Sequence, residues 1–139
     1  MGVRNTVLVV DDEKDLVALL ASVLRKAGLL VLEAVGAAEA IAICEDPATS
    51  IDLILSDFQM PGMNGLELAD YVVSIRPKIA VILMSANCSR LDTIAARGFE
   101  FIQKPFPFDD LVARITERLS EESLLRRPVL NELLFSGDS

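Results

Sequence analysis

The chain has 139 residues, the usual size of one domain, and 52% of them are apolar but only 5% aromatic. Its formal net charge is -8 and no segment gathers Lys and Arg into a basic face, which argues against direct binding of nucleic acid. The absence of histidine excludes histidine-based triads, and no apolar run reaches about 18 residues, so we expect a cytoplasmic protein that does not enter a membrane.

Short apolar runs alternate along the chain with longer segments of helical period, and this order recurs about five times. Such alternation predicts an α/β fold, with a parallel sheet and helices on both of its faces. The first, third and fourth runs are nearly continuous Val, Ile and Leu, which is typical of strands covered on both sides. The predicted strands are Thr6–Val10, Leu29–Ala34, Ile51–Ser56, Ile79–Met84 and Phe99–Gln103.

A helix is expected after each of these strands. The first should end at Gly28, because a helix commonly stops at a glycine with positive φ, and Pro47 and Pro77 should stop the second and third. The last carries an apolar stripe that should pack on the sheet. The predicted helices are Leu16–Ala27, Ala37–Cys44, Leu66–Ile75, Leu91–Arg97 and one with Phe108, Leu111, Val112, Ile115 and Leu119 on its stripe.

The sequence predicts one folded domain over residues 5–120. Residues 121–139 should form a C-terminal extension, in which Pro128 interrupts any helix. Leu130, Leu133 and Leu134 have helical spacing, so the extension is either a short amphipathic helix or a disordered segment.

Polar residues stand at the ends of four predicted strands. Because parallel strands bring their C-terminal ends to one edge, we expect these side chains to meet there. Three carboxylates at one edge repel one another unless a cation neutralises them, and ligands that are all oxygen favour Mg²⁺, with Mn²⁺ as a substitute. A lysine and a hydroxyl beside them suit an incoming phosphoryl group. The residues are Asp11 and Asp12, Asp57, Ser85 and Lys104.

Four motifs in this order resemble the receiver domains of response regulators in two-component signalling. They are VLVVDDE at 7–13, SDFQMPGMNG at 56–65, MSA at 84–86 and KPF at 104–106. The resemblance extends from about residue 5 to 120. It implies a doubly wound, flavodoxin-like sheet of five strands in the order 2-1-3-4-5.

The resemblance also implies roles for the acidic residues. Asp57 would accept a phosphoryl group from a sensor histidine kinase, a phosphotransfer protein or a small donor such as acetyl phosphate. Asp12 and Asp57 would bind Mg²⁺ directly, together with the backbone carbonyl of Gln59. Asp11 would act mainly through a bound water.

Further residues match positions that the family uses to hold the phosphoryl group and to switch. Ser85 and Lys104 would each contact a phosphoryl oxygen, and Phe101 would be the switch aromatic that moves inward with Ser85. Pro105 follows the lysine, where the family often has a cis peptide bond. The residues expected to shape loops are Pro61, Gly62, Gly65 and Pro105.

One departure from the family pattern concerns the protein's partners. Ser85 and Lys104 are 19 positions apart, which is shorter than in chemotaxis-type receivers and predicts a trimmed fourth helix or trimmed loops beside it. That region is the family's usual signalling face, so the downstream protein target and any homodimer geometry stay open.

Two other functions compete with phosphoacceptance. A magnesium-dependent phosphohydrolase of the haloacid dehalogenase type should carry Asp-x-Asp at its nucleophile, but Gln59 stands two residues after Asp57. A receiver-like interaction module that is never phosphorylated is the other alternative. We therefore expect a signalling protein that is not an enzyme beyond its own phosphorylation and dephosphorylation.

Overall fold

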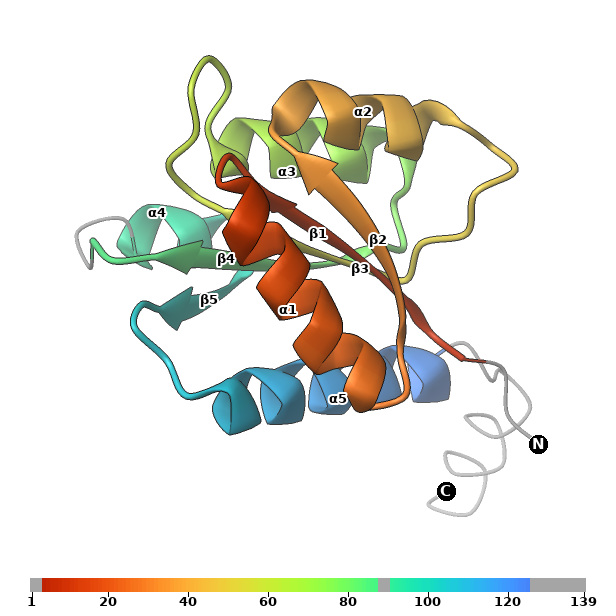
Figure 1. The fold of residues 1–139 in the computed structure, drawn as a ribbon. Coiled ribbons are helices and arrows are strands. Elements are labelled where there is room, and N and C mark those ends of the chain that lie inside the picture. The colour runs from red at the N-terminus through yellow and green to blue at the C-terminus, as the bar shows by residue number, and fades with distance from the viewer. Residues whose placement is uncertain (1–3, 88–90, 126–139) are drawn as a thin grey trace, which may run out of the picture.

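The computed structural model describes residues 4–87 and 91–125 (Figure 1). Five parallel strands form one sheet in the order β2-β1-β3-β4-β5, which confirms the predicted fold and strand order. The strands are β1 (Thr6–Asp11), β2 (Leu30–Val35), β3 (Leu53–Asp57), β4 (Ala80–Ser85) and β5 (Glu100–Gln103). The helices are α1 (Lys14–Lys26), α2 (Ala37–Glu45), α3 (Gly65–Ile75), α4 (Leu91–Ala96) and α5 (Phe108–Leu125).

The strands that carry the polar residues run one residue further than the sequence predicted. Asp11, Asp57 and Ser85 are the last residues of β1, β3 and β4 and do not follow them. Their backbones still pair with the neighbouring strands, as Asp57 does with Met84 and Ser85 with Gln103. A polar side chain ends the apolar pattern but does not end the ladder of backbone hydrogen bonds, so the pattern places the end of each of these strands one residue too early. At their other ends, β3 begins two residues and β4 one residue later than predicted.

Strand burial follows position in the sheet. Every residue of β1, β3 and β4 is buried, as their continuous apolar sequences predicted. The outer strands β2 and β5 are buried only in part. The polar ends of three fully covered strands therefore lie at the margin of a water-excluding core.

The helices cover the sheet on both faces, as Figure 1 shows. On one face, α1 and α5 pack through Leu20, Leu24 and Leu111 against alternate residues of the strands. On the other face, α2 and α3 pack through residues such as Ala40 and Leu68, and α4 adds Ile94. The sheet thus has a hydrophobic cluster on each side, as in other three-layer α/β folds.

The end of α1 shows why the chain turns there. Gly28 has a φ of +96°, which an L side chain rarely adopts, as the sequence predicted. Its N–H donates to the Arg25 carbonyl, and the Leu29 N–H donates to the Leu24 carbonyl at 3.2 Å. These are the two bonds of a Schellman motif, which satisfies carbonyls at the helix end and starts the chain towards β2.

The last two helices can be compared with the predicted fourth helix and with the predicted end of the domain at residue 120. Helix α4 has six residues in the described ranges and begins directly after residues that lie outside them, so the trimming expected from the short spacing between Ser85 and Lys104 stays a prediction. Helix α5 continues to Leu125, five residues into the expected extension. The part of the extension that contains Pro128, Leu130, Leu133 and Leu134 lies outside the described residues. Among the described helices, none has the combined length and apolar character that crossing a bilayer requires.

Candidate functional site

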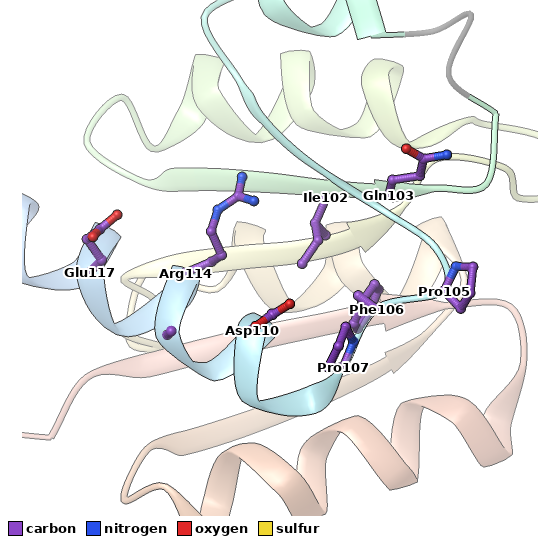
Figure 2. Close-up of a pocket in the computed structure, with 9 residues that line it drawn as sticks. Ile102, Gln103, Pro105, Phe106, Pro107, Asp110, Arg114 and Glu117 are labelled. Carbon is purple, nitrogen blue, oxygen red and sulfur yellow. The ribbon is translucent and has the colours of Figure 1, made fainter.

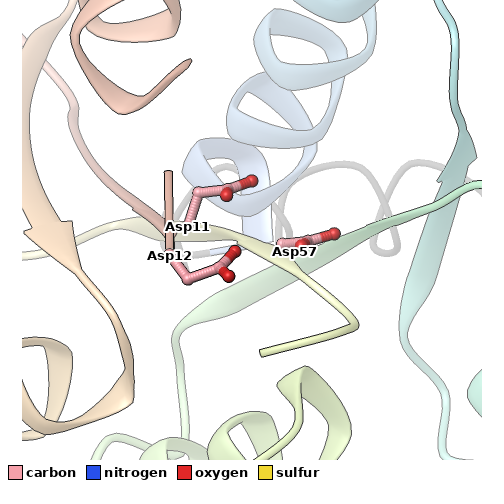
Figure 3. Close-up of side chains that lie close together, drawn as sticks. All are labelled: Asp11, Asp12 and Asp57. Carbon is pink, nitrogen blue, oxygen red and sulfur yellow. The ribbon is translucent and has the colours of Figure 1, made fainter. Parts of the chain in front are cut away.

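Three carboxylates from two strands meet at the C-terminal edge of the sheet. One oxygen from each of Asp11, Asp12 and Asp57 lies within 4.8 Å of the others. Figure 3 shows the three side chains side by side, with Asp57 reaching the group from β3 and the other two from the end of β1. The sequence predicted this meeting, because parallel strands bring their C-terminal ends to one edge of the sheet.

Lys104 completes the group of charges. Its ammonium Nζ donates a hydrogen bond to Asp57 Oδ1 at 3.0 Å and lies 3.7 Å from Asp11 Oδ2. Its backbone N–H donates to the Ser85 carbonyl at 2.9 Å, and its peptide bond to Pro105 is cis. Lys104 therefore contacts the ends of β1, β3 and β4 while it belongs to the segment that joins β5 to α5.

The predicted hydroxyl and aromatic residues lie on neighbouring strands. Ser85 is buried, and its Oγ accepts a hydrogen bond from the Asn87 N–H at 3.0 Å. Accepting this bond leaves the hydroxyl proton available for donation. Phe101 on β5 is half-buried against the cluster that α2 and α3 cover. The structure thus places Ser85 on β4, the strand next to that of Asp57, and Phe101 one strand further out, while their switching roles stay predictions.

Asp11 is the most confined of the three acids, with no exposed surface. Its Oδ1 accepts a hydrogen bond from the Glu13 N–H at 2.9 Å, while its buried Oδ2 has no hydrogen-bond partner among the described residues. Burial raises the pKa of the Asp11 carboxyl to about 6; the charge of Asp57 adds to this rise, and the Glu13 N–H and Lys104 oppose it. A buried acid with one unpartnered oxygen is what a nearby cation would stabilise.

We expect Asp11→Asn to stabilise the metal-free chain at neutral pH. The pKa of Asp11 in the folded chain is raised above 3.8 to about 6, so the folded state binds the proton more tightly than the unfolded state. The free energy of unfolding therefore falls as pH rises through this range. Removing the charge should add about 1–3 kcal/mol at pH 7, and the gain should vanish at low pH, where both states are protonated.

Urea unfolding in the presence of a chelator, at pH 7 and at acidic pH, measures this difference. Asp15→Asn is the matched control, because Asp15 is an exposed acid on α1 and its loss should change stability by less than about 0.5 kcal/mol. An Asp11→Asn gain that is the same at both pH values would contradict the explanation by burial.

The loop after β3 forms one wall of the site. An open cleft of about 490 Å³ is lined by residues that include Asp12, Gln59 and Pro61. Gln59 and Pro61 are exposed, so the cleft is open to solvent beside the carboxylates. Gln59 and Asp12 thus line the same cleft, and the role of the Gln59 backbone carbonyl stays a prediction.

Two glycines shape this loop for different reasons. Gly62 has a φ of +81°, which an L side chain rarely adopts. The φ of Gly65 is not positive, so backbone conformation does not explain the glycine at this position. Its N–H donates to the Phe58 carbonyl at 2.7 Å, and a Cβ at Gly65 would lie only 2.3 Å from the Asp57 backbone oxygen. Gly65 is thus required by the close approach of α3 to the strand that carries Asp57.

A capping box fixes the start of α3, and the sequence reading missed it. The Asn64 side chain accepts a hydrogen bond from the Glu67 N–H at 2.8 Å, and the Glu67 side chain accepts one from the Asn64 N–H at 3.0 Å. The signal was the Asn-x-x-Glu spacing just before an apolar helix. This cap positions the loop that ends at Gly65.

Comparison with known proteins agrees with this geometry. The family model of the response regulator receiver domain matches residues 7–116. The chain belongs to this family. Its members are the receiver domains of two-component signal transduction.

Individual relatives show how far the likeness extends. The receiver domain is 38% identical over 130 residues to the nitrogen assimilation regulatory protein NtrX of Azorhizobium caulinodans, covering 90% of this chain and 28% of that protein. It is 30% identical to the uncharacterized transcriptional regulatory protein YrkP of Bacillus subtilis, covering 93% and 55%. The chain therefore spans about half or less of these curated relatives.

A solved structure matches over its whole length. The CheY-like receiver domain protein of Methanospirillum hungatei superimposes with a TM-score of 0.80 at 27% sequence identity, covering 87% of this receiver domain and 98% of that chain. The shared part is thus the receiver fold itself.

Proposed function

We propose that Asp57 of this receiver domain accepts a phosphoryl group from a phosphohistidine on a sensor histidine kinase or phosphotransfer protein. The observation that carries the proposal is the placement of Asp57 between Lys104, at 3.0 Å, and two further carboxylates at an open edge of the sheet. In this proposal the modified domain then presents a changed surface to a downstream protein.

Asp57 is placed to act as the nucleophile. It ends a fully buried strand, and its side chain retains 11% exposure at the site. In the proposed reaction a carboxylate oxygen of Asp57 forms a new bond to phosphorus. The bond from phosphorus to the donor nitrogen or oxygen breaks, and its electron pair leaves with the donor.

The residues present fit a hard divalent cation such as Mg²⁺. The acidic cluster contains only oxygen ligands and includes a buried oxygen of Asp11 that lacks a hydrogen bond. Asp12, Asp57 and the Gln59 carbonyl would hold the ion directly, and the deeper Asp11 would act through water. When bound, the ion would offset the negative charge of the carboxylates and of the incoming phosphoryl oxygens.

Lys104 and Ser85 would distinguish the modified from the unmodified state. The Lys104 ammonium already lies beside Asp57 and would pair with a phosphoryl oxygen. The Ser85 hydroxyl would donate its proton to another. Contacts that exist only with the phosphoryl group shift a two-state equilibrium, and Phe101, half-buried on β5, would report this shift by moving inward.

Incubation with acetyl phosphate, followed by intact mass measurement, tests the proposal. We expect the chain to gain the mass of one phosphoryl group when Mg²⁺ or Mn²⁺ is present, and to gain none when a chelator removes the metal ion. No gain with acetyl phosphate or with any phosphohistidine donor would favour the non-phosphorylated interaction module. Multiple turnover of phosphate monoesters would favour the phosphohydrolase.

A further inference from the structure

Within residues 4–87 and 91–125, the two outer strands of the sheet present backbone groups that no neighbouring strand pairs. On the β2 side, the Leu30 N–H donates to the Asn5 carbonyl and the Gly36 N–H donates to the Asp11 carbonyl. Backbone direction alternates along a strand, so the groups of Val31, Glu33 and Val35 face away from β1. An edge of this kind is a template for pairing with a strand of another chain.

Side chains of the same domain occupy part of the β2 edge. Arg25, in the last turn of α1, donates from Nη2 to the Val31 carbonyl at 3.0 Å and pairs through Nη1 with Glu33 at 3.0 Å. At the other end of the strand, the Val35 N–H donates to Glu39 Oε1 at 2.8 Å. The outward carbonyl of Val31, near the start of the strand, and the outward N–H of Val35, at its end, therefore already have hydrogen-bond partners within the domain.

The β5 edge has the same construction. The Lys104 N–H donates to the Ser85 carbonyl, so alternation directs the groups of Phe101 and Gln103 outward. Arg114 of α5 donates from Nη2 to the Phe101 carbonyl at 2.8 Å and from Nε to Glu100 at 2.7 Å. Figure 2 shows the Arg114 side chain rising from α5 towards β5.

The two arrangements use the same chemistry at opposite ends of the sheet. In each, an arginine from one of the two helices on the same sheet face bonds an outward carbonyl and an acid of the edge strand. Exposed ion pairs of this type contribute little to stability, and the Arg25 and Arg114 side chains are 51% and 39% exposed. Folding stability is therefore a weak reason for both arginines to lie over the edges.

We propose that Arg25 and Arg114 close the two edges of the sheet to strand pairing with a second copy of this chain. A charged side chain laid over an edge occupies the acceptor and places a cation where the next strand would lie. Leu30 on β2 is 46% exposed, so an open edge there would also offer apolar surface to a second copy. Association between copies of the domain is then restricted to its helical faces.

The test compares self-association of the whole chain with that of Arg25→Ala and Arg114→Ala, by sedimentation over a range of concentrations. Each variant should associate about fivefold more tightly than the unaltered chain, the factor that corresponds to one hydrogen bond. Amide exchange should locate the contact, because the Glu33 N–H should gain protection in the first variant and the Gln103 N–H in the second.

Matched variants separate edge closure from loss of charge. Arg118→Ala removes an ion pair with the same Glu100, 3.6 Å away, and Glu33→Gln removes the ion pair of Arg25, but neither removes a carbonyl bond. Both should associate like the unaltered chain. If the alanine variants unfold at a lower urea concentration than the unaltered chain, Arg25→Met and Arg114→Met replace them in the test. Methionine keeps the apolar part of the arginine side chain but cannot donate to the carbonyl.

Two results would overturn the proposal. One is folded arginine variants that associate no more tightly than Arg118→Ala and Glu33→Gln. The other is tighter association without new protection of the Glu33 or Gln103 amide, because the copies would then meet through another surface.

Discussion

Asp57→Asn is expected to abolish uptake of the phosphoryl group from acetyl phosphate in the presence of Mg²⁺. The amide has nearly the shape of the carboxylate, so the fold should persist, but it lacks the charge that makes the oxygen a nucleophile and that Lys104 contacts at 3.0 Å. Intact mass measurement gives the result directly. An Asp57→Asn chain that still gains one phosphoryl group would assign the acceptor to another residue.

Two matched variants make this result specific. Asp15→Asn removes an exposed carboxylate of α1 and should be phosphorylated like the unaltered chain. Asp12→Asn removes an acid that we assign to the cation but leaves the nucleophile intact. Its phosphorylation should be slow at low Mg²⁺ concentration and should recover as the concentration is raised. Failure of Asp12→Asn to recover would contradict its assignment as a metal ligand.

Gly65→Ala should cause the largest loss of stability at the site. The new Cβ would lie 2.3 Å from the Asp57 backbone oxygen and 2.9 Å from Phe58 Cα, and neither backbone atom can rotate away as a side chain would. We expect a loss of about 2–4 kcal/mol in the free energy of unfolding. Urea unfolding measures it, and slower phosphorylation should accompany it because the clash displaces the strand end that carries Asp57.

Gly62→Ala is the control for this loop. Gly62 has a positive φ but open space where a Cβ would stand, so the substitution should cost only about 1–2 kcal/mol of backbone strain. Equal losses of unfolding free energy for Gly65→Ala and Gly62→Ala would contradict the predicted steric clash at Gly65.

Much of the fold followed from the sequence because burial imposes simple patterns. The continuous Val, Ile and Leu of β1, β3 and β4 mark strands covered on both faces, and the structure buries every residue of these strands. Parallel strands also share one C-terminal edge, so Asp57 and Lys104 could be placed together although 47 positions separate them.

Other features depend on distances that a pattern does not contain. The need for glycine at position 65 arises from one backbone passing close to another, which only the packed structure reveals. Asp11 and Asp12 are neighbours in sequence, yet one is fully buried and the other exposed. The bonds of Arg25 and Arg114 to carbonyls require the strand register, which sets the direction of each backbone group.

The position of Lys104 has a consequence for the outer surface of the domain. The two residues that follow it, Pro105 and Phe106, line two separate grooves, one that includes Arg114 of α5 and one that includes Leu16 of α1. The hydrogen bond that the Lys104 N–H donates to the Ser85 carbonyl ties this short segment to the end of β4. Any displacement of this segment together with Lys104 would therefore change the shape of both grooves at once.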